Sequence, residues 1–319
     1  MILNHVPERY FYTYGPNEPS IHVEPGSTII TTTVDAGGRD QNGDLITDDM
    51  KQRIPGTTIR ESNPLTGPFY VEGSEPGDTI VVKILDIKLN RSYAYSAIPS
   101  YFGCHTEEGP GRRFLFNPPL ERKYYHWDLD HDRNLGILDL PESKIRKVEI
   151  PLEPFLGSIG VAPRFGRVEI TLTPGEYGGN MDCVETMKGA TLHLPVFHEG
   201  GFLVFGDVHA AQGDGELCGV GLETSAEVHL HVDLVKGQNL EWPRIEDDDW
   251  IMSACSSRPL MEAYKLAHYQ MAEWLTKEYG FEYMDAIQVL SQVGRCRVGN
   301  VVDPNYTVVA KYPKKFLPE

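Results

Sequence analysis

The chain has 319 residues, of which 40% are hydrophobic and 24% charged, and a chain of this length can bury a full hydrophobic core without disulfides. Its 29 Lys and Arg residues face 46 Asp and Glu residues, for a formal net charge of −17. Nucleic acids and anionic membranes are bound by basic surfaces, so this charge argues against both as partners. The length indicates two domains or one large β-rich domain.

The cysteines and the N-terminal segment bear on the cellular compartment. The chain has 5 cysteines, an odd number, and no C-x-x-C pair, which indicates reduced thiols in the cytoplasm. The first residues contain no apolar segment typical of a signal peptide. No apolar run approaches the roughly 20 residues that a membrane-spanning helix needs. We therefore expect a cytoplasmic protein.

Short strand-like segments, bounded by turn residues and rich in β-branched side chains, run through most of the chain. They are residues 80–89, 148–152, 168–172, 191–196, 202–208 and 227–235. Many short strands separated by Gly and Pro are typical of a sandwich or barrel. The sequence therefore predicts a mainly β fold built of sandwich or barrel layers.

Two short segments are similar in sequence, which reflects either chance or two equivalent turns. Residues 23–29 (V-E-P-G-S-T-I) resemble residues 74–80 (S-E-P-G-D-T-I). Pro followed by Gly suits the two central positions of a type II turn, which requires a positive φ at the second. We expect each turn to lead into a strand, in related β layers.

Helical periodicity appears only near the C-terminus. Apolar residues recur at steps of three and four over residues 260–279, which predicts an amphipathic helix. Ser256 or Ser257 can cap its start, and Gly280 can end it. A second helix is predicted over residues 282–293. The apolar faces of these two helices could serve a homodimer.

The least regular stretch covers residues 103–147, and we place the domain boundary there. The predicted organisation is an N-terminal β-rich lobe (1–147) and a C-terminal β-rich lobe with the terminal helices (148–319). A single intertwined domain is the alternative.

The segment richest in candidate catalytic and metal-binding residues is G-D-V-H-A-A-Q-G-D-G-E at residues 206–216. Because side chains alternate along a strand, Asp207 and His209 share one face. The Gly-rich stretch that follows allows Glu216 to return beside them. A carboxylate, an imidazole and a second carboxylate at one strand end suit Zn²⁺ or a similar divalent ion. A polar loop with ordinary hydrogen bonds is the alternative.

A second Gly-rich segment, P-G-E-Y-G-G-N-M-D-C at residues 174–183, holds further candidates. Gly178 and Gly179 permit a positive φ or a close backbone approach. Asp182 is a candidate metal ligand. Cys183 could act as a thiol nucleophile if a base lies beside it, or be an inert buried thiol.

Other titratable residues stand on strands. Asp35 ends a Thr-rich strand, where it could bind a metal, contact substrate or cap the loop. His229 and His231 share a strand face with Glu227 and Asp233, while the opposite face is apolar. We expect this histidine face to meet solvent or an interface and not to bind a metal. The sequence contains no G-x-S-x-G, H-E-x-x-H or phosphate-loop motif.

Taken together, these segments resemble the acetamidase/formamidase family. The resemblance covers nearly the whole chain and lies in four stretches: G-P-F-Y-V-E-G-S-E-P-G-D-T-I (67–80), P-F-L-G-S-I-G-V-A-P (154–163), G-E-Y-G-G-N-M-D (175–182) and G-D-V-H-A-A-Q-G-D-G-E (206–216). The V-D-A at 34–36 and V-V-D-P at 301–304 also fit. The resemblance implies a β-sandwich-like fold, small linear amides of the formamide or acetamide type as substrates, and dependence on a metal.

Five residues fall on matching motif positions, and we assign them hypothetical roles. A divalent ion, zinc first and calcium or manganese as alternatives, is held by Asp35, Asp182 and His209. Glu216 is the general base, and Asp207 is a further ligand or an orienting residue. The resemblance leaves open which carboxylate binds the metal and which moves the proton. In this hypothesis the backbone N–H groups near Gly178 and Gly179 bind the oxyanion.

Two alternatives remain open at this point. The first is a metal-free amidase that uses Cys183, which thiol reagents would inactivate and chelators would not. The second is a non-enzymatic β-protein that binds a metal or a small ligand, because a fold alone does not establish a function.

Overall fold

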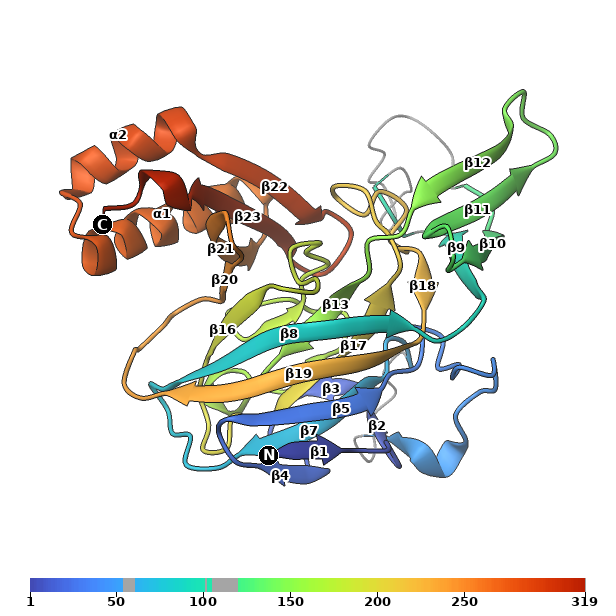
Figure 1. Ribbon diagram of the computed structural model, residues 1–319, viewed down its shortest axis with the longest axis horizontal. Coiled ribbons are helices and arrows are strands. Elements are labelled where there is room, and N and C mark those ends of the chain that lie inside the picture. The colour runs from blue at the N-terminus through green and yellow to red at the C-terminus, as the bar shows by residue number, and fades with distance from the viewer. Residues whose placement is uncertain (54–60, 101, 105–119, 319) are drawn as a thin grey trace.

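The computed structural model describes residues 1–53, 61–100, 102–104 and 120–318 (Figure 1). Two large sheets enclose one core, which confirms the mainly β fold. The first sheet has nine strands, in the order β1 (Ile2–Asn4), β5 (Ser27–Thr32), β19 (Ala226–Val235), β8 (Thr79–Leu89), β16 (Thr191–Pro195), β20 (Arg244–Glu246), β21 (Trp250–Ser257), β23 (Tyr306–Pro313) and β22 (Arg295–Asn300).

The second sheet has twelve strands. Along its main path these are β12 (Arg146–Pro151), β11 (Leu135–Leu140), β10 (Lys123–Asp130), β9 (Tyr93–Ile98), β18 (Glu223–Thr224), β17 (Leu203–His209), β7 (Leu65–Val71), β2 (Tyr10–Phe11) and β6 (Lys51–Gln52). Three strands join beside this path: β13 (Phe155–Gly160), β15 (Gly178–Asn180) and β4 (Ile21–Val23). A separate pair is formed by β3 (Thr13–Tyr14) and β14 (Glu169–Ile170). Three short 3-10 helices are η1 (Asp48–Met50), η2 (Arg164–Gly166) and η3 (Lys314–Phe316).

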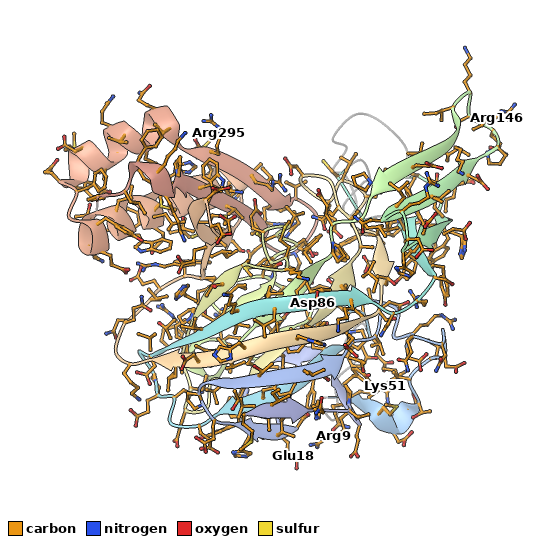
Figure 2. All side chains as sticks on the ribbon, viewed as in Figure 1. Arg9, Glu18, Lys51, Asp86, Arg146 and Arg295 are labelled. Atoms are coloured by element: carbon orange, nitrogen blue, oxygen red, sulfur yellow. The ribbon has the colours of Figure 1, made fainter. Side chains whose placement is uncertain are left out.

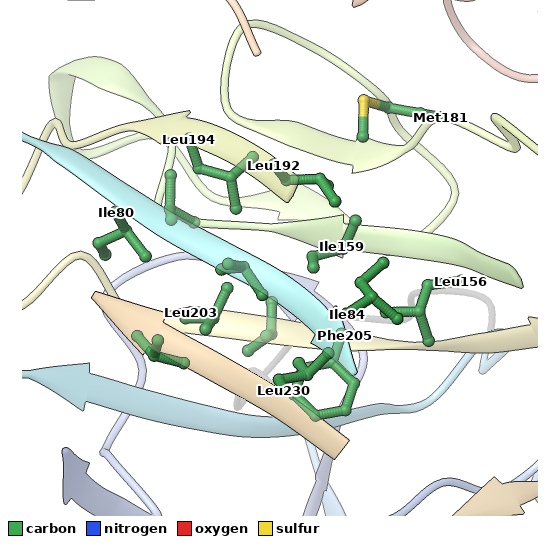
Figure 3. Close-up of a cluster of buried hydrophobic side chains, with 14 of the residues drawn as sticks. Ile80, Ile84, Leu156, Ile159, Met181, Leu192, Leu194, Leu203, Phe205 and Leu230 are labelled. Carbon is green, nitrogen blue, oxygen red and sulfur yellow. The ribbon is translucent and has the colours of Figure 1, made fainter. Parts of the chain in front are cut away.

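Apolar side chains from both sheets fill the space between them (Figure 3). Ile84 of β8 and Leu230 of β19 come from the first sheet, and Ile159 of β13 and Phe205 of β17 come from the second. All four are fully buried. Burial of this kind contributes roughly 1.5–3 kcal/mol per large side chain, so this core fixes where strands β13 and β17 lie.

The sequence repeat corresponds to a structural repeat. Gly26 and Gly77 have φ values of 81° and 95°, as the predicted turns require. One turn joins β4 to β5 and the other joins β7 to β8. Strands β4 and β7 pair in the second sheet, while β5 and β8 flank β19 in the first. Each copy therefore carries the chain from one sheet to the other.

The two C-terminal helices are α1 (Leu260–Tyr279) and α2 (Tyr283–Val293), which confirms the predicted ranges to within one residue. Gly280 ends α1 in a left-handed conformation, with φ 71°, also as predicted. The predicted cap is wrong, because Ser256 and Ser257 still belong to β21 and the N-cap residue of α1 is Pro259.

Helix α1 packs on β21 and β23 through a buried face that includes Ala267, Met271 and Leu275. We call α1, α2 and the strands β21, β22 and β23 the helical layer. Figure 1 shows it at the upper left of the molecule, while strands β9–β12 extend as an arm at the upper right. In Figure 2, Arg295 of β22 marks the helical layer and Arg146 the tip of the arm.

Two expectations from the sequence are wrong. Residues 123–140 are not irregular, because β10 and β11 form an antiparallel meander with β9 and β12; residues 105–119 lie outside the described residues. The strand predicted at 168–172 is reduced to the two residues of β14, which pair with β3. Both errors reflect pairing between strands, which local composition does not encode.

The large sheets combine strands from both predicted lobes. In the first sheet, β5 and β8 of the N-terminal half alternate with β19 and β16 of the C-terminal half. The expected boundary after residue 147 falls inside β12. All five cysteines are free, as their number and spacing predicted. Within the described ranges, no helix is long and apolar enough to cross a membrane.

Candidate active site

A cavity of about 720 Å³ opens where the arm meets the two sheets. Strand β9 forms one wall through Tyr93, Tyr95 and Ala97, which alternate along the strand. The cavity ends on buried polar residues. We call these residues, with the two buried behind them, the polar centre: Asn180, Asp182, Asp207, His209, Glu216, Glu223 and Asp303.

Strand pairing brings an acid to the buried histidine. In the antiparallel ladder of β17 and β18, His209 lies opposite Glu223. The Nε2 atom of His209 is 3.2 Å from Oε1 of Glu223 and 3.6 Å from Oδ1 of Asp207. Asp207 and His209 share a strand face, as the alternation predicted.

A second ladder positions an amide between the carboxylates. Asn180 of β15 lies opposite Ser158 of β13. The Nδ2 atom of Asn180 donates to Oδ2 of Asp182 at 3.2 Å and to Oδ2 of Asp303 at 2.8 Å. Its Oδ1 atom accepts hydrogen bonds from Ser158 and Asn63. Since Asp303 is far away in sequence, this amide joins the C-terminal part of the chain to the centre.

The imidazole is oriented from behind by an amide side chain. The Oε1 atom of Gln212 lies 2.7 Å from Nδ1 of His209. The Nε2 group of Gln212 donates to the carbonyls of Asp182 and Gly299 at 2.9 and 3.1 Å. With its amide so fixed, Gln212 accepts from a protonated Nδ1, which leaves Nε2 of His209 able to bind a cation.

Backbone strain is concentrated at this site. Asp182, Asp207 and Glu216 have φ values of 47°, 54° and 48°, and Asn63 beside them has 52°. Left-handed backbone in residues other than Gly costs on the order of 1 kcal/mol or more each, and it clusters at functional sites. The fold therefore holds these acids in orientations that relaxed strands would not give.

Two glycines leave space that the polar centre needs. A Cβ atom on Gly157 would lie 2.8 Å from Oδ2 of Asp207 and 2.9 Å from Oδ1 of Asp182. A Cβ atom on Gly221 would lie 2.4 Å from Nδ1 of His209. Neither glycine can be replaced without displacing an acid or the imidazole.

The buried carboxyl groups of the polar centre repel one another when they are ionised. Burial, followed by the nearby charges of Glu216 and Asp303, raises the pKa of Asp182 well above its ordinary value. Burial also raises the pKa of Glu223 and of Asp303 to about 7 each. Burial lowers the pKa of His209, but the charges of Glu223 and Asp207 outweigh it and the net change is upward. Buried carboxylates of one sign are stable only with protons or with a cation.

The residues present fit a divalent metal ion. Two groups place one ligand atom from each member within 4.8 Å of the others: Asp182, His209 and Glu216, and Asp207, His209 and Glu223. Among the described residues, three buried carboxylate oxygens have no hydrogen-bond partner, namely Asp182 Oδ1, Asp207 Oδ1 and Glu223 Oε2. Imidazole with carboxylate donors is a set that suits zinc.

The structure brings together four of the five residues singled out from the sequence, and it places the fifth differently. Asp35 lines the cavity, but its Oδ1 accepts from the N–H groups of Gly37 and Arg39 at 3.0 and 2.9 Å. Its Oδ2 accepts from Arg91 Nη1 at 2.8 Å. Both oxygens are therefore engaged, and Asp35 belongs to neither ligand group.

Cys183 lies in the hydrophobic core, where its thiol donates to Oε2 of Glu185 at 3.1 Å. Burial raises the pKa of this thiol well above its ordinary value. Because the thiolate is the reactive form, this environment favours the inert interpretation.

Two other expectations can be compared with the structure. The face of β19 that carries His229 and His231 is partly exposed, as the alternation predicted. The N–H group of Gly178 donates to the carbonyl of Gly175, so it is not available to bind an oxyanion and that expectation is wrong for Gly178.

Sequence reasoning assigned no role to four residues of this site, of which Asn180 lies inside the 174–183 motif. Gln212 lies inside the 206–216 motif, and Asp303 lies inside the V-V-D-P segment, but neither was assigned a role. Glu223 had no local signal, since its position opposite His209 depends on the β17–β18 pairing. A search for acids that can face His209 across a hairpin would have found it.

The fold and the site define a two-sheet β-protein with a buried carboxylate–imidazole centre beneath a cavity. A sequence model of the acetamidase/formamidase family matches residues 13–168 and 166–317. The chain belongs to the acetamidase/formamidase family. This confirms the resemblance seen in the motifs.

Individual relatives agree with this assignment. The structure of an acetamidase from Yersinia enterocolitica is 34% identical and superposes with a TM-score of 0.85 over 100% of this chain and 94% of that chain. An acetamidase of Mycolicibacterium smegmatis is 28% identical over 61% of this chain and 59% of that protein. A formamidase of Methylophilus methylotrophus is 28% identical over 69% of this chain and 63% of that protein. The chain thus spans about three fifths of the length of these curated relatives.

Proposed function

We propose that this chain hydrolyses a small linear amide to the carboxylic acid and ammonia, with a divalent metal ion, zinc first. The observation that carries the proposal is the pair of ligand groups that share His209 at the inner end of the cavity. The acetamidases and formamidases among the relatives support the amide as substrate class. A cytoplasmic location and a homodimer, expected from the sequence, stay predictions.

We assign the metal to Asp182, His209 and Glu216. Asp182 and His209 are almost completely buried, and Gln212 fixes the tautomer that leaves Nε2 of His209 able to bind a cation. The chemistry that such an ion supplies when bound is a lowered pKa of a water molecule and polarisation of a carbonyl group. Asp35 is left out of the ligand set because Arg91 and two backbone N–H groups occupy its oxygens. It instead positions the loop at the cavity wall.

Three acids of the polar centre then remain, and we assign the proton transfer to Asp207 and Glu223. Both line the cavity, and each has one oxygen without a hydrogen-bond partner among the described residues. Asp303 is left out because its Oδ2 accepts from Asn180. The N–H group of Gly221 donates to Oε1 of Glu223 at 3.0 Å and holds that carboxylate in place. In this proposal the pair takes a proton from the attacking water and delivers it to the departing ammonia.

The first experiment measures ammonia released from formamide and acetamide. The protein is stripped with a chelator and resupplied with zinc, manganese or calcium. Loss on stripping and recovery with one ion is the expected result. Activity that is insensitive to the chelator but lost with thiol reagents would instead support a metal-free amidase that uses Cys183. A bound ion without turnover of any amide would favour a metal-binding protein that is not an enzyme.

The second experiment separates the roles of the acids. In Glu216→Gln we expect the bound metal and the activity to be lost together, whereas Glu223→Gln should keep the metal and lose activity. Asp214→Asn is the control, because Asp214 lies in the same loop with its side chain 63% exposed. If Glu216→Gln retained the metal and lost only activity, Glu216 would be the base and the second group would hold the ion.

A further inference from the structure

We infer that the preferred substrate is a primary amide whose acyl group carries a flat aromatic ring, bound along the β9–β10 wall of the cavity. This inference rests on the proposed function. It concerns the part of the cavity beyond the polar centre, where the reacting amide group would not lie.

The cavity is much larger than formamide or acetamide. Its volume is about 720 Å³, whereas a group of water size takes roughly 30 Å³ in a liquid. The four non-hydrogen atoms of acetamide therefore fill roughly 120 Å³. Such a substrate would leave most of the cavity to water.

The unused part of the cavity is lined by aromatic rings and by the charged side chains of Arg39, Glu61 and Arg122. The guanidinium of Arg122 lies 4.7 Å from the ring centroid of Tyr124 and covers one face of that ring. Tyr93, Tyr95 and Ala97 alternate along β9 and present one face of that strand. Tyr124 of β10 lies opposite Ala97 in the ladder, and its ring centroid is 6.4 Å from that of Tyr95. Phe102 also lines this space. The small side chain of Ala97, next to two large rings, leaves room for a flat group.

The orientation of the substrate follows from the geometry and the chemistry together. The acids lie at the buried end of the cavity, while the side chain of Tyr124 is 57% exposed. An amide that releases ammonia carries its only substituent on the acyl side. With the carbonyl at the polar centre, that substituent must extend past Tyr95 toward Tyr124. Aromatic pairs in offset or edge-to-face contact gain attraction beyond the burial of their area, so these rings should bind an aromatic substituent more tightly than an aliphatic one of similar size.

The test compares phenylacetamide with acetamide as substrates of the metal-loaded protein. We expect kcat/KM for phenylacetamide to exceed that for acetamide by about tenfold or more. Tyr124→Ala should lower this ratio by about three- to tenfold, because one ring contact is lost. Ala97→Leu should lower this ratio at least as much, because the larger side chain fills the space beside the two rings.

The control is Tyr125→Ala. Tyr125 is the next residue on β10, points to the other face of the strand and does not line this cavity. It should leave the ratio unchanged. A ratio near one in the wild type, or equal effects of Tyr124→Ala and Tyr125→Ala, would overturn the inference.

A binding measurement keeps the inference separate from the proposed function. Calorimetry with phenylacetate and with acetate tests the cavity without any turnover. Tighter binding of phenylacetate, weakened by Tyr124→Ala, supports the aromatic site even if no amide is hydrolysed. Equal affinities for the two acids would overturn the inference even if acetamide is hydrolysed well.

Discussion

The helical layer and the polar centre are both buried, but they are built on opposite principles. Met271 and Leu275 of α1 are fully buried among apolar neighbours, and removal of such side chains from water stabilises the fold. Asp182 and His209 are buried to the same degree among acids that repel one another. The helical layer therefore stabilises the fold, whereas the buried charges of the polar centre destabilise it. A costly buried cluster that the fold nevertheless holds in place is the mark of a functional site.

The largest effect should come from adding one methyl group to the polar centre. In Gly221→Ala the new Cβ overlaps the His209 ring, so the imidazole must move. Because a displacement of about 1 Å can cost about 100-fold in rate, we expect amide hydrolysis and metal binding to fall at least that much.

Gly213→Ala is the matched control for this change. Gly213 lies in the loop that joins the same two strands, β17 and β18, and no atom of the part of the chain that the structure describes lies within 4 Å of its added Cβ. Full activity in Gly213→Ala with loss in Gly221→Ala would support the assignment of His209. Full activity in both variants would remove His209 from the site.

The same kind of change in the helical layer should affect only stability. Met271→Ala removes a fully buried side chain, which typically lowers the free energy of unfolding by about 2–5 kcal/mol. We expect activity per folded molecule to remain. Met261→Ala, at a residue of the same helix that is 60% exposed, should change unfolding in urea by less than about 0.5 kcal/mol. Loss of activity in folded Met271→Ala protein would show that the two regions are coupled.

A smaller effect is expected from the amide behind the histidine. Gln212→Met keeps the size of the side chain but removes the contact with Nδ1 of His209 and the two hydrogen bonds to backbone carbonyls. Partners of this kind change metal affinity by about 10–100-fold. A metal titration would measure the change. An affinity equal to that of the wild type would mean that Gln212 does not orient the ligand.

The smallest expected effect is on the pH dependence of stability, and it arises from Glu246, which lies outside both regions. Contacts with His193, followed by Lys314, lower the pKa of Glu246 to about 2 from its ordinary value of 4.5. Because the folded pKa is the lower one, this carboxylate stabilises the fold above pH 4.5 and loses that contribution as the pH falls toward 2. Glu246→Gln should therefore melt lower than the wild type at pH 7, by about 2 °C at most.

The difference between the Glu246→Gln protein and the wild type should shrink as the pH falls through that window. Glu142→Gln, at an exposed position on the arm, serves as the control. A difference in melting temperature that does not vary with pH would show that the contacts with His193 and Lys314 are not the cause.

The sequence predicts the C-terminal helices better than it predicts the polar centre. The two helices are encoded locally, since the spacing of apolar residues and Gly280 define α1 almost to the residue. The strands on which they pack, β21 and β23, were not among the predicted strands. The strands at 80–89 and 227–235 are predicted as well as α1, because their alternation is also local. Asp207 and His209 were found because they share one strand. Glu223 and Asp303 were not, because only pairing between distant segments brings them to the centre.

The contact between Asn180 and Asp303 has a consequence for the order in which the protein forms. The two residues are 123 positions apart, and Asn300 adds hydrogen bonds to the carbonyls of Asn180 and Met181. During synthesis, the strands around residue 180 leave the ribosome well before these partners exist. The buried and mutually repulsive acids cannot be held together until residues 300–303 have been synthesised. The nascent chain can therefore begin to assemble its hydrophobic layers well before the polar centre is complete.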